Sequence, residues 1–388
     1  MTSWRVPLMD VTLGPEEVDA VAAVLKSGWL SMGPETLRFE EEFARFLGVP
    51  YALAVANGTV ALHLACAALG LGPGDEVLSP ALTFVATANA VLYTGARPVF
   101  VDVGGPHDLN LLVADAARKV SPRTRAIMAV HYAGYVCDLD GIRGLAQKHN
   151  LKVIEDAAHA PGGVYHSSGG AALLGTLGDA GCFSFFANKN LTTGEGGLLA
   201  TRDPEVAETV RLARSHGMSS LTWDRHRGHS LSYDVTLLGY NYRIDEMRAA
   251  LGRVQLAKLP QANARRRELT RRYREKLEDI AGLTLPFASQ TEASACHLLP
   301  LVLPPGADRA VFMAALAARG IQTSIHYPPI HRFSYYRRLW PAGFDHHLPE
   351  TEAVAPRLVT LPLFPAMTLE QQDLVAAAVR DFFAEKDR

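Results

Sequence analysis

One lysine of the chain, Lys189, lies where an amine could act as a nucleophile. A predicted apolar strand ends at Ser184 and Phe185, and Lys189 follows shortly afterwards, ahead of the glycine-rich turn Gly194–Gly197. Aromatic and small neighbours would exclude water from this lysine, lower its pKa and allow it to form a Schiff base. A loop lysine is more often a solvated charge, but the position of Lys189 between Ser184 and the glycine turn favours the reactive interpretation.

A pair of carboxylates, Glu155 and Asp156, ends another predicted apolar strand. A buried carboxylate is energetically costly unless it is paired or hydrogen-bonded. Asp156 could cap the turn that follows it, or it could meet a positively charged group of a ligand. Ligands of parallel sheets bind beyond the carboxyl ends of the strands, which is where this carboxylate is expected.

A third strand end carries Gly58 and Thr59 at the start of a predicted helix. Gly58 would let the backbone approach a ligand, and Thr59 would supply a hydroxyl group. The free N–H groups at a helix N-terminus attract anions. The segment could therefore hold a phosphate, or it could be a plain turn with its helix cap.

These strand ends belong to a pattern in which short apolar runs alternate with longer amphipathic segments. The alternation predicts an α/β fold with a mostly parallel sheet that helices cover on both faces. The seven expected strands are Tyr51–Ala56, Glu76–Ser79, Pro98–Asp102, Ala126–Tyr132, Leu151–Glu155, Gly181–Phe185 and Leu198–Thr201. The expected helices are Pro15–Lys26, Thr59–Leu69, Phe84–Tyr93, Asp138–His149, Glu205–His216 and Asp245–Leu256.

The pattern changes after Leu256, where a long charged helix from Pro260 to about Ile280 leads into a smaller α/β unit. The expected elements of this unit are strands at Ala295–Leu303 and Gln322–His326 and helices at Ala307–Arg319 and Leu369–Glu385. The sequence therefore predicts a large domain over residues 1–256 and a small C-terminal domain over residues 257–388.

Composition and charge exclude several functional classes. The 38 Lys and Arg residues nearly balance the 40 Asp and Glu residues, so the formal net charge of −2 gives no reason to expect nucleic acid as the main ligand. The basic run Arg265–Arg274 is better explained as a solvated helix face. We expect no membrane span, no signal peptide and a cytoplasmic location. The four cysteines are widely separated and the histidines form no HExxH motif, so no metal site is predicted.

Together the motifs resemble the sugar aminotransferases of the DegT/DnrJ/StrS family, which are fold-type-I pyridoxal-phosphate enzymes. The resemblance runs from end to end of the chain. The motifs that carry it are Gly28–Gly33, Pro80–Ala90, Asp156, Ser184–Phe186 with Lys189, Thr192–Gly197, Gly239–Arg243 and His326–His331.

The resemblance implies that pyridoxal 5′-phosphate is the cofactor and assigns its contacts. The implied catalytic residues are Lys189, Asp156 and His159, and the implied cofactor contacts are these three with Gly58, Thr59, Phe84, Ser184 and Asn241. Lys189 would hold the cofactor as a Schiff base and later carry a proton, while Asp156 would pair with the pyridine nitrogen. His159 would lie beside the ring oxygen of the cofactor or on one face of its ring. Phe84 would stack on the opposite face of that ring.

Gly58, Thr59 and Ser184 would then hold the phosphate group. Asn241 would reach the phosphate of the neighbouring subunit, so that the active site would need a homodimer. The alternative for Asn241 is a turn residue that precedes a helix.

For the substrate pocket, the resemblance indicates regions of the chain and does not assign a role to each residue. Its expected residues are Trp29, Ser31, Arg225, His229, His326, Tyr327 and His331. Aromatic residues can cover a sugar face, and basic residues can meet a diphosphate, although the segment Trp223–His229 could equally be a structural or interface loop. The segment Pro161–Gly170 is longer and richer in glycine than the family pattern, which leaves the shape of that wall open.

The resemblance predicts a ping-pong transfer of an amino group from an amino acid, with glutamate expected as the donor, to a nucleotide-linked deoxy-keto-hexose. The product would be an amino sugar for a cell-surface polysaccharide or an antibiotic. Lys189 argues against the dehydrase branch of the family, which carries histidine at this position. Two alternatives stay open: an aminotransferase for a keto-inositol in aminoglycoside biosynthesis, and a non-catalytic cofactor-binding regulator.

Overall fold

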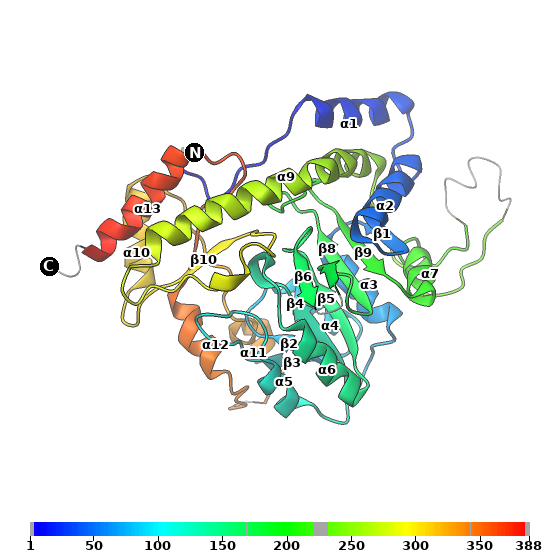
Figure 1. Cartoon of the computed structure of the whole chain (residues 1–388). Coiled ribbons are helices and arrows are strands. Elements are labelled where there is room, and N and C mark those ends of the chain that lie inside the picture. Colours follow the sequence, from blue (N-terminus) through cyan, green and yellow to red (C-terminus); the bar gives the residue numbers. More distant parts are fainter. Residues whose placement is uncertain (1–3, 168–169, 221–231, 342, 385–388) are drawn as a thin grey trace.

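The computed structural model describes residues 4–167, 170–220, 232–341 and 343–384 (Figure 1). Its centre is a seven-stranded sheet in the order β1-β9-β8-β5-β4-β2-β3. The strands are β1 (Tyr51–Val55), β2 (Glu76–Pro80), β3 (Arg97–Val101), β4 (Thr124–Val130), β5 (Lys152–Asp156), β8 (Ala180–Ser184) and β9 (Gly197–Thr201). Only β9 runs antiparallel to its neighbours, β1 and β8, so the predicted mostly parallel sheet of seven strands is confirmed.

Helices cover both faces of this sheet. They are α2 (Pro34–Leu47), α3 (Gly58–Ala68), α4 (Ala86–Tyr93), α5 (Val113–Lys119), α6 (Leu139–His149) and α7 (Pro204–Ala213), whereas α1 (Pro15–Ser27) packs on the outside of α9 (Glu246–Leu277) (Figure 1). Successive residues of a strand point to opposite faces, so Ile127 joins the hydrophobic cluster of α2 and α6, and Met128 joins that of α3, α4 and α7. The sequence analysis did not predict α2 or α5.

A single helix, α9 (Glu246–Leu277), replaces the two helices that the sequence predicted before and after Pro260. Proline lacks the N–H that an interior turn needs, which is why Pro260 was interpreted as a helix start. Here Leu256 and Leu259 before the proline and Asn263 after it are buried, and they anchor the helix on both sides of Pro260. Figure 1 shows α9 crossing the molecule from α2 to α13. The division of the chain between residues 256 and 257 stays a prediction, and it falls inside this helix.

The C-terminal part contains a two-stranded antiparallel sheet of β10 (Leu299–Val302) and β11 (Leu358–Leu361). Its helices are α10 (Arg309–Ala318), α11 (Ser334–Arg337), α12 (Pro349–Val354) and α13 (Leu369–Ala384). Short 3-10 turns occur at Tyr132–Gly134, Ala288–Gln290, Ile330–Arg332 and Ala355–Arg357. The predicted strand Gln322–His326 is wrong, because only single bridges, Val6 with Ile321 and Ser324 with Thr360, form in that region.

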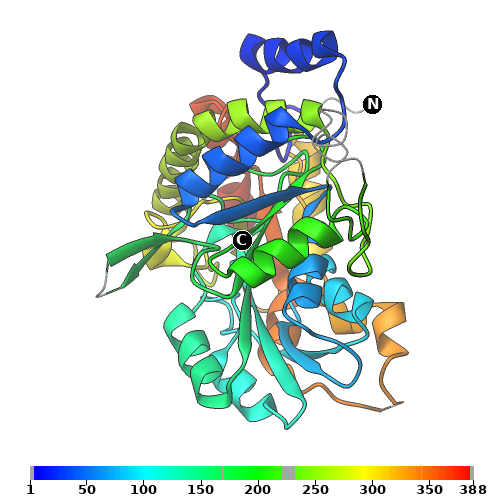
Figure 2. The ribbon, with the colours of Figure 1, turned by 90° about the vertical axis from the view of Figure 1, so that its right-hand side faces the viewer.

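A small hairpin occupies the glycine-rich segment that departs from the family pattern. It pairs β6 (Val164–Ser167) with β7 (Gly170–Leu173). Figure 2 shows these strands projecting sideways from the body of the molecule. Among the described helices, none combines the length and the apolar character that a membrane crossing requires.

Candidate active site

Lys189 follows the end of β8, in a tight turn that returns the chain to β9. The N–H of Lys189 donates to the carbonyl of Phe186 at 2.9 Å, and the N–H of Thr193 donates to that of Phe185 at 2.9 Å. The lysine is half-buried. Burial lowers its pKa to about 8, although the negative charge of Asp156 acts in the opposite direction. This lowered pKa agrees with the desolvation that the sequence predicted.

Asp156 ends β5 and is only 6% exposed. Thr87 donates its hydroxyl to Oδ2 of this carboxylate at 2.7 Å, and the N–H of Ala158 donates to Oδ1 at 3.2 Å. Burial raises the pKa of Asp156, and these donors together with the charge of Lys189 oppose the rise. The carboxylate is therefore held in place, with a single charged amine nearby.

The adjacent carboxylate, Glu155, points away from Asp156 and has a structural role. It accepts N–H groups from Gly175 at 2.8 Å and from Leu177 and Gly178 at 2.6 Å each, and its Oε2 lies 2.9 Å from Nε2 of His131. Burial alone would raise the pKa of Glu155, but these hydrogen bonds hold it below its ordinary value. The two carboxylates of the motif thus point to opposite sides of the strand, Asp156 toward Thr87 and Glu155 toward His131.

His159 is buried beside Asp156, and both nitrogens of its ring have partners. The N–H of Ala133 donates to Nδ1 at 3.2 Å, and Nε2 lies 3.0 Å from the hydroxyl of Tyr327. Burial lowers the pKa of His159 well below its ordinary value, and the charge of Lys189 adds to this effect. The neutral ring must therefore carry its proton on Nε2 and donate it to Tyr327, whose own hydroxyl proton can point elsewhere.

Phe84 presents an open aromatic face at this edge of the sheet. Its side chain is 53% exposed, and its ring centroid lies 5.7 Å from that of Tyr327. The resemblance requires an exposed aromatic ring at this position, because a planar cofactor can stack on it.

The start of α3 has the geometry that the predicted anion cradle requires. The side chain of Asn57 accepts the N–H of Val60 at 3.0 Å, while the N–H groups of Gly58 and Thr59 have no acceptors within the helix because they lie in its first turn. A Cβ at position 58 would lie 2.7 Å from the Cβ of Ser184, closer than carbon atoms approach. Glycine therefore brings the helix N-terminus against the Ser184 hydroxyl, as a phosphate site needs.

Asn241 lies beside this cradle but on an exposed segment. Its backbone pairs with Ser215, and the carbonyl of the next residue, Tyr242, accepts the N–H of Ala56 at 2.8 Å. The side chain of Asn241 is exposed. Its contact with the phosphate of a neighbouring subunit stays a prediction.

The expected substrate residues fall into different surroundings. Tyr327 joins the site through His159, and Nδ1 of His326 lies 2.9 Å from the hydroxyl of Thr360. Tyr132 donates its hydroxyl to the carbonyl of His326. Burial lowers the pKa of His326 to about 4, and the charge of Lys189 acts in the same direction. This histidine is therefore neutral at physiological pH.

His331 contacts other groups. Its Nε2 lies 2.6 Å from the carboxylate of Glu352, and its ring contacts those of Phe100 and His346. Arg225 and His229 lie outside the described residues.

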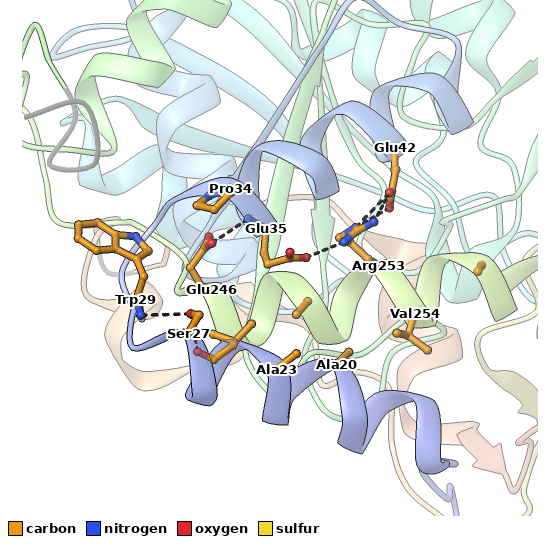
Figure 3. A pocket seen from close by; sticks show the side chains of 13 residues that line it. Ala20, Ala23, Ser27, Trp29, Pro34, Glu35, Glu42, Glu246, Arg253 and Val254 are labelled. Atoms are coloured by element: carbon orange, nitrogen blue, oxygen red, sulfur yellow. Dashed lines mark hydrogen bonds and ion pairs between the residues drawn. The ribbon is translucent and has the colours of Figure 1, made fainter. Parts of the chain in front are cut away.

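Trp29 and Ser31 lie on the connection between α1 and α2. Trp29 lines a cavity of about 590 Å³ between α1, α2 and α9 (Figure 3), whereas Lys189 lines a separate cavity of about 450 Å³. In the first cavity, Glu246 accepts N–H groups of Gly33, Glu35 and Thr36 at 2.7–2.9 Å and so caps α2. The structure thus does not bring Trp29 to Lys189 within one chain.

Sequence reasoning missed four residues that organise the site: Thr87, His131, Asn190 and His297. Thr87 lies inside the motif Pro80–Ala90 and Asn190 directly follows Lys189, so a search for hydrogen-bonding side chains there could have found them. His297 lies far along the chain from Lys189, and no local pattern marked it.

Comparisons with known proteins identify the family of this chain. The sequence profile of the DegT/DnrJ/EryC1/StrS aminotransferase family matches residues 11–380. The chain is 41% identical, over 97% of its own length and 96% of the relative's, to the spore coat polysaccharide biosynthesis protein SpsC of Bacillus subtilis. It is 36% identical to the aminotransferase TlmJ of Streptoalloteichus hindustanus, with all of both chains covered and a TM-score of 0.88.

A third similar structure, Spr1654 of Streptococcus pneumoniae, has been solved in its PLP form. It is 27% identical over 98% of both chains, with a TM-score of 0.88. The resemblance that the sequence motifs suggested is confirmed, and so is the fold-type-I architecture. The chain therefore belongs to the DegT/DnrJ/EryC1/StrS aminotransferase family and is an aminotransferase.

Proposed function

We propose that this aminotransferase moves an amino group from L-glutamate to a nucleotide-linked keto sugar by a ping-pong reaction that uses pyridoxal 5′-phosphate. The observation that carries the proposal is the arrangement of Lys189, whose pKa burial lowers to about 8, beside Asp156 and the neutral His159. A desolvated amine and a buried carboxylate at the carboxyl edge of a parallel sheet are the groups that this cofactor needs.

The residues present fit the cofactor at three points. The first turn of α3 and Ser184 offer N–H and hydroxyl donors for a phosphate. The exposed ring of Phe84 offers a stacking face, and the carboxylate of Asp156 offers an acceptor for a pyridine N–H. When bound, pyridoxal phosphate withdraws electrons from the carbon that bears the amino group and makes its proton acidic.

The protein's own groups would divide the remaining work. Lys189 would hold the cofactor through Nζ, and after its release Nζ would take the proton from the amino-acid carbon. A pKa near 8 leaves a useful fraction of this amine neutral at physiological pH. The hydrogen bond from Thr87 keeps the Asp156 carboxylate oriented, and the neutral His159 and Tyr327 add hydrogen bonds without adding charge.

The sugar part of the proposal is supported by SpsC, whose name places it in spore coat polysaccharide biosynthesis. The ring of Tyr327, which lies beside that of Phe84, could cover a sugar face. We further propose a homodimer in which Asn241 completes the partner's phosphate site.

One observation favours a second acceptor, a keto-cyclitol, which carries no diphosphate. Of the basic residues expected to meet a diphosphate, His331 is already hydrogen-bonded to Glu352. Since the family is one of enzymes, the non-catalytic alternative is not retained.

The first experiment is a visible absorption spectrum of the purified protein with pyridoxal phosphate, before and after addition of L-glutamate. We expect an absorption band that glutamate removes, and borohydride added before glutamate should fix the cofactor on Lys189, as peptide mass spectrometry would show. Borohydride labelling at another lysine, or a band that glutamate leaves unchanged, would contradict the proposal. The aminated protein can then be screened against nucleotide-linked keto sugars and keto-cyclitols.

A further inference from the structure

A second histidine, His297, lies directly behind His159. It precedes β10, is 4% exposed, and its ring centroid lies 4.5 Å from that of His159. The two residues also share a backbone anchor. The N–H of His297 donates to the carbonyl of Ala133 at 2.9 Å, and the N–H of Ala133 donates to Nδ1 of His159 at 3.2 Å. Any shift of His297 would therefore reach His159 by two routes, the ring contact and Ala133.

The same imidazole is tied to the lysine turn through Asn190, the residue after Lys189. The amide nitrogen of Asn190 donates to the carbonyl of Ala295 at 2.8 Å and to Oδ1 of Asn263 at 2.9 Å. Its Oδ1 therefore faces Nδ1 of His297, 2.9 Å away, and must accept a hydrogen bond from the N–H at that position. This arrangement fixes the tautomer of His297 with the proton on Nδ1.

The network continues into the turn that follows His159. The side chain of Asn263, on α9, donates to the carbonyl of Pro161 at 2.8 Å. A Cβ at Gly162 would lie 2.8 Å from that amide nitrogen, so the turn is packed closely against the network. The chain on either side of the candidate site is thus bonded to one buried cluster, His297, Asn190 and Asn263.

The cluster adds no charge beside the lysine. Burial lowers the pKa of His297 well below its ordinary value, and the charges of Lys189 and Arg266 act in the same direction. Two neutral rings can stack where two imidazolium rings would repel each other. A ring that only filled space would not need the amide partner.

We propose that His297 is a positioning residue for the transamination site, which holds the ring of His159 and the turn of Lys189 in one arrangement. The inference rests on the proposed function, because it concerns how that reaction is supported. His297 would contact neither substrate nor cofactor and would act through His159 and Asn190. A misplacement of about 1 Å at a reacting group can cost on the order of 100-fold in rate, so such support has a measurable effect.

Two substitutions separate the two contacts. His297→Phe keeps a ring behind His159 but loses the hydrogen-bond donor to Asn190. His297→Asn keeps a donor near Asn190 and loses the ring. The matched control is His346→Phe. His346 is half-buried among the rings of Trp340 and Phe344 and contacts neither Lys189 nor His159. If His297→Phe does not fold, Asn190→Ala removes the same hydrogen bond and leaves the ring in place.

The readout that a merely structural role would not move is the titration of Lys189. Its labelling by pyridoxal phosphate and borohydride is followed against pH by peptide mass spectrometry. We expect the midpoint of His297→Phe, or of Asn190→Ala, to rise from about 8 toward the ordinary lysine value of 10.5 as water enters the turn. We expect kcat to fall about tenfold or more in both His297 variants, with KM for glutamate within about twofold.

The outcomes are distinct. If the His297 variants keep the wild-type midpoint and a kcat within about twofold, His297 positions nothing, and the inference is overturned while the proposed function stands. If they lose only thermal stability, the residue is structural, and the inference is again overturned. If the wild-type protein itself forms no adduct at Lys189, the proposed function fails first, and the inference falls with it.

Discussion

The hydrogen bond from Thr87 to Asp156 allows a quantitative test of the site. The bond is buried and 2.7 Å long, and a hydrogen bond to an ionised carboxylate contributes about 1.5–3 kcal/mol. Thr87→Val keeps the shape of the side chain and removes the donor. Because the lost bond stabilised the ionised carboxylate, the pKa of Asp156, which burial already raises, should rise further, by roughly 1–2 units at 1.36 kcal/mol per unit.

The direction of the pH effect follows from this shift. Asp156 must be ionised to hold a proton on a pyridine nitrogen, so the acidic limb of the rate profile should move to higher pH in Thr87→Val. We expect the rate of the glutamate half-reaction, followed by stopped-flow absorbance, to fall about 10- to 100-fold at pH values below the pKa of Asp156 and to change little well above it. KM for glutamate should change little, because the bond supports the chemical step and not substrate binding.

Two control variants show whether the hydroxyl is responsible. Thr87→Ser retains the donor and should remain within about threefold of the wild type, since the hydroxyl can still reach the carboxylate. Thr83→Val removes a hydroxyl that lies 3.2 Å from that of Thr87 and does not contact Asp156, so its effect should be much smaller. An unshifted acidic limb in Thr87→Val, or equal losses in Thr83→Val and Thr87→Val, would refute the reasoning.

Three further predictions concern the cofactor site. Lys189→Ala should abolish turnover but leave a folded protein that binds pyridoxal phosphate noncovalently, as equilibrium dialysis and circular dichroism would show; retained turnover would remove the mechanism. Gly58→Ala should weaken cofactor binding about tenfold or more, because its Cβ would lie 2.7 Å from that of Ser184, and unchanged affinity would refute the cradle. Mixing Lys189→Ala with Asn241→Ala subunits should restore some activity if Asn241 serves the partner's site, whereas undiminished cofactor affinity of the Asn241→Ala protein alone would argue against that role.

The sheet could be predicted from the sequence because its strands carry their own signal. Short apolar runs flanked by glycine and polar residues identified all seven strands within about two residues. The failures have physical causes. Pro260 looked like the start of a helix, and only the packing of Leu256 and Leu259 shows why α9 passes through it. The segment Gln322–His326 has strand-like residues but too few pairing partners.

The site itself could be predicted only where local motifs mark it. Lys189 and Asp156 each follow a buried strand, so their position at the sheet edge follows from the fold class. Their supporting residues come from distant parts of the chain. His297 is recognised only when the fold brings it to within 4.5 Å of His159, and the partnership of His331 with Glu352 depends on the packing of α12.

The cap on α2 has a consequence for the order in which the protein is made. The donors of this helix start lie at Gly33, Glu35 and Thr36, and their acceptor, Glu246, lies more than 200 positions later in the chain. During synthesis, α2 leaves the ribosome long before its acceptor exists, so the N–H groups of its first turn must bind water until Glu246 arrives. The packing of α9 against α2 is therefore a late event. A nascent chain that stops before residue 246 should leave uncovered the part of Phe39 that lies against Gly252, whereas Phe43 can already pack on Phe183 of β8.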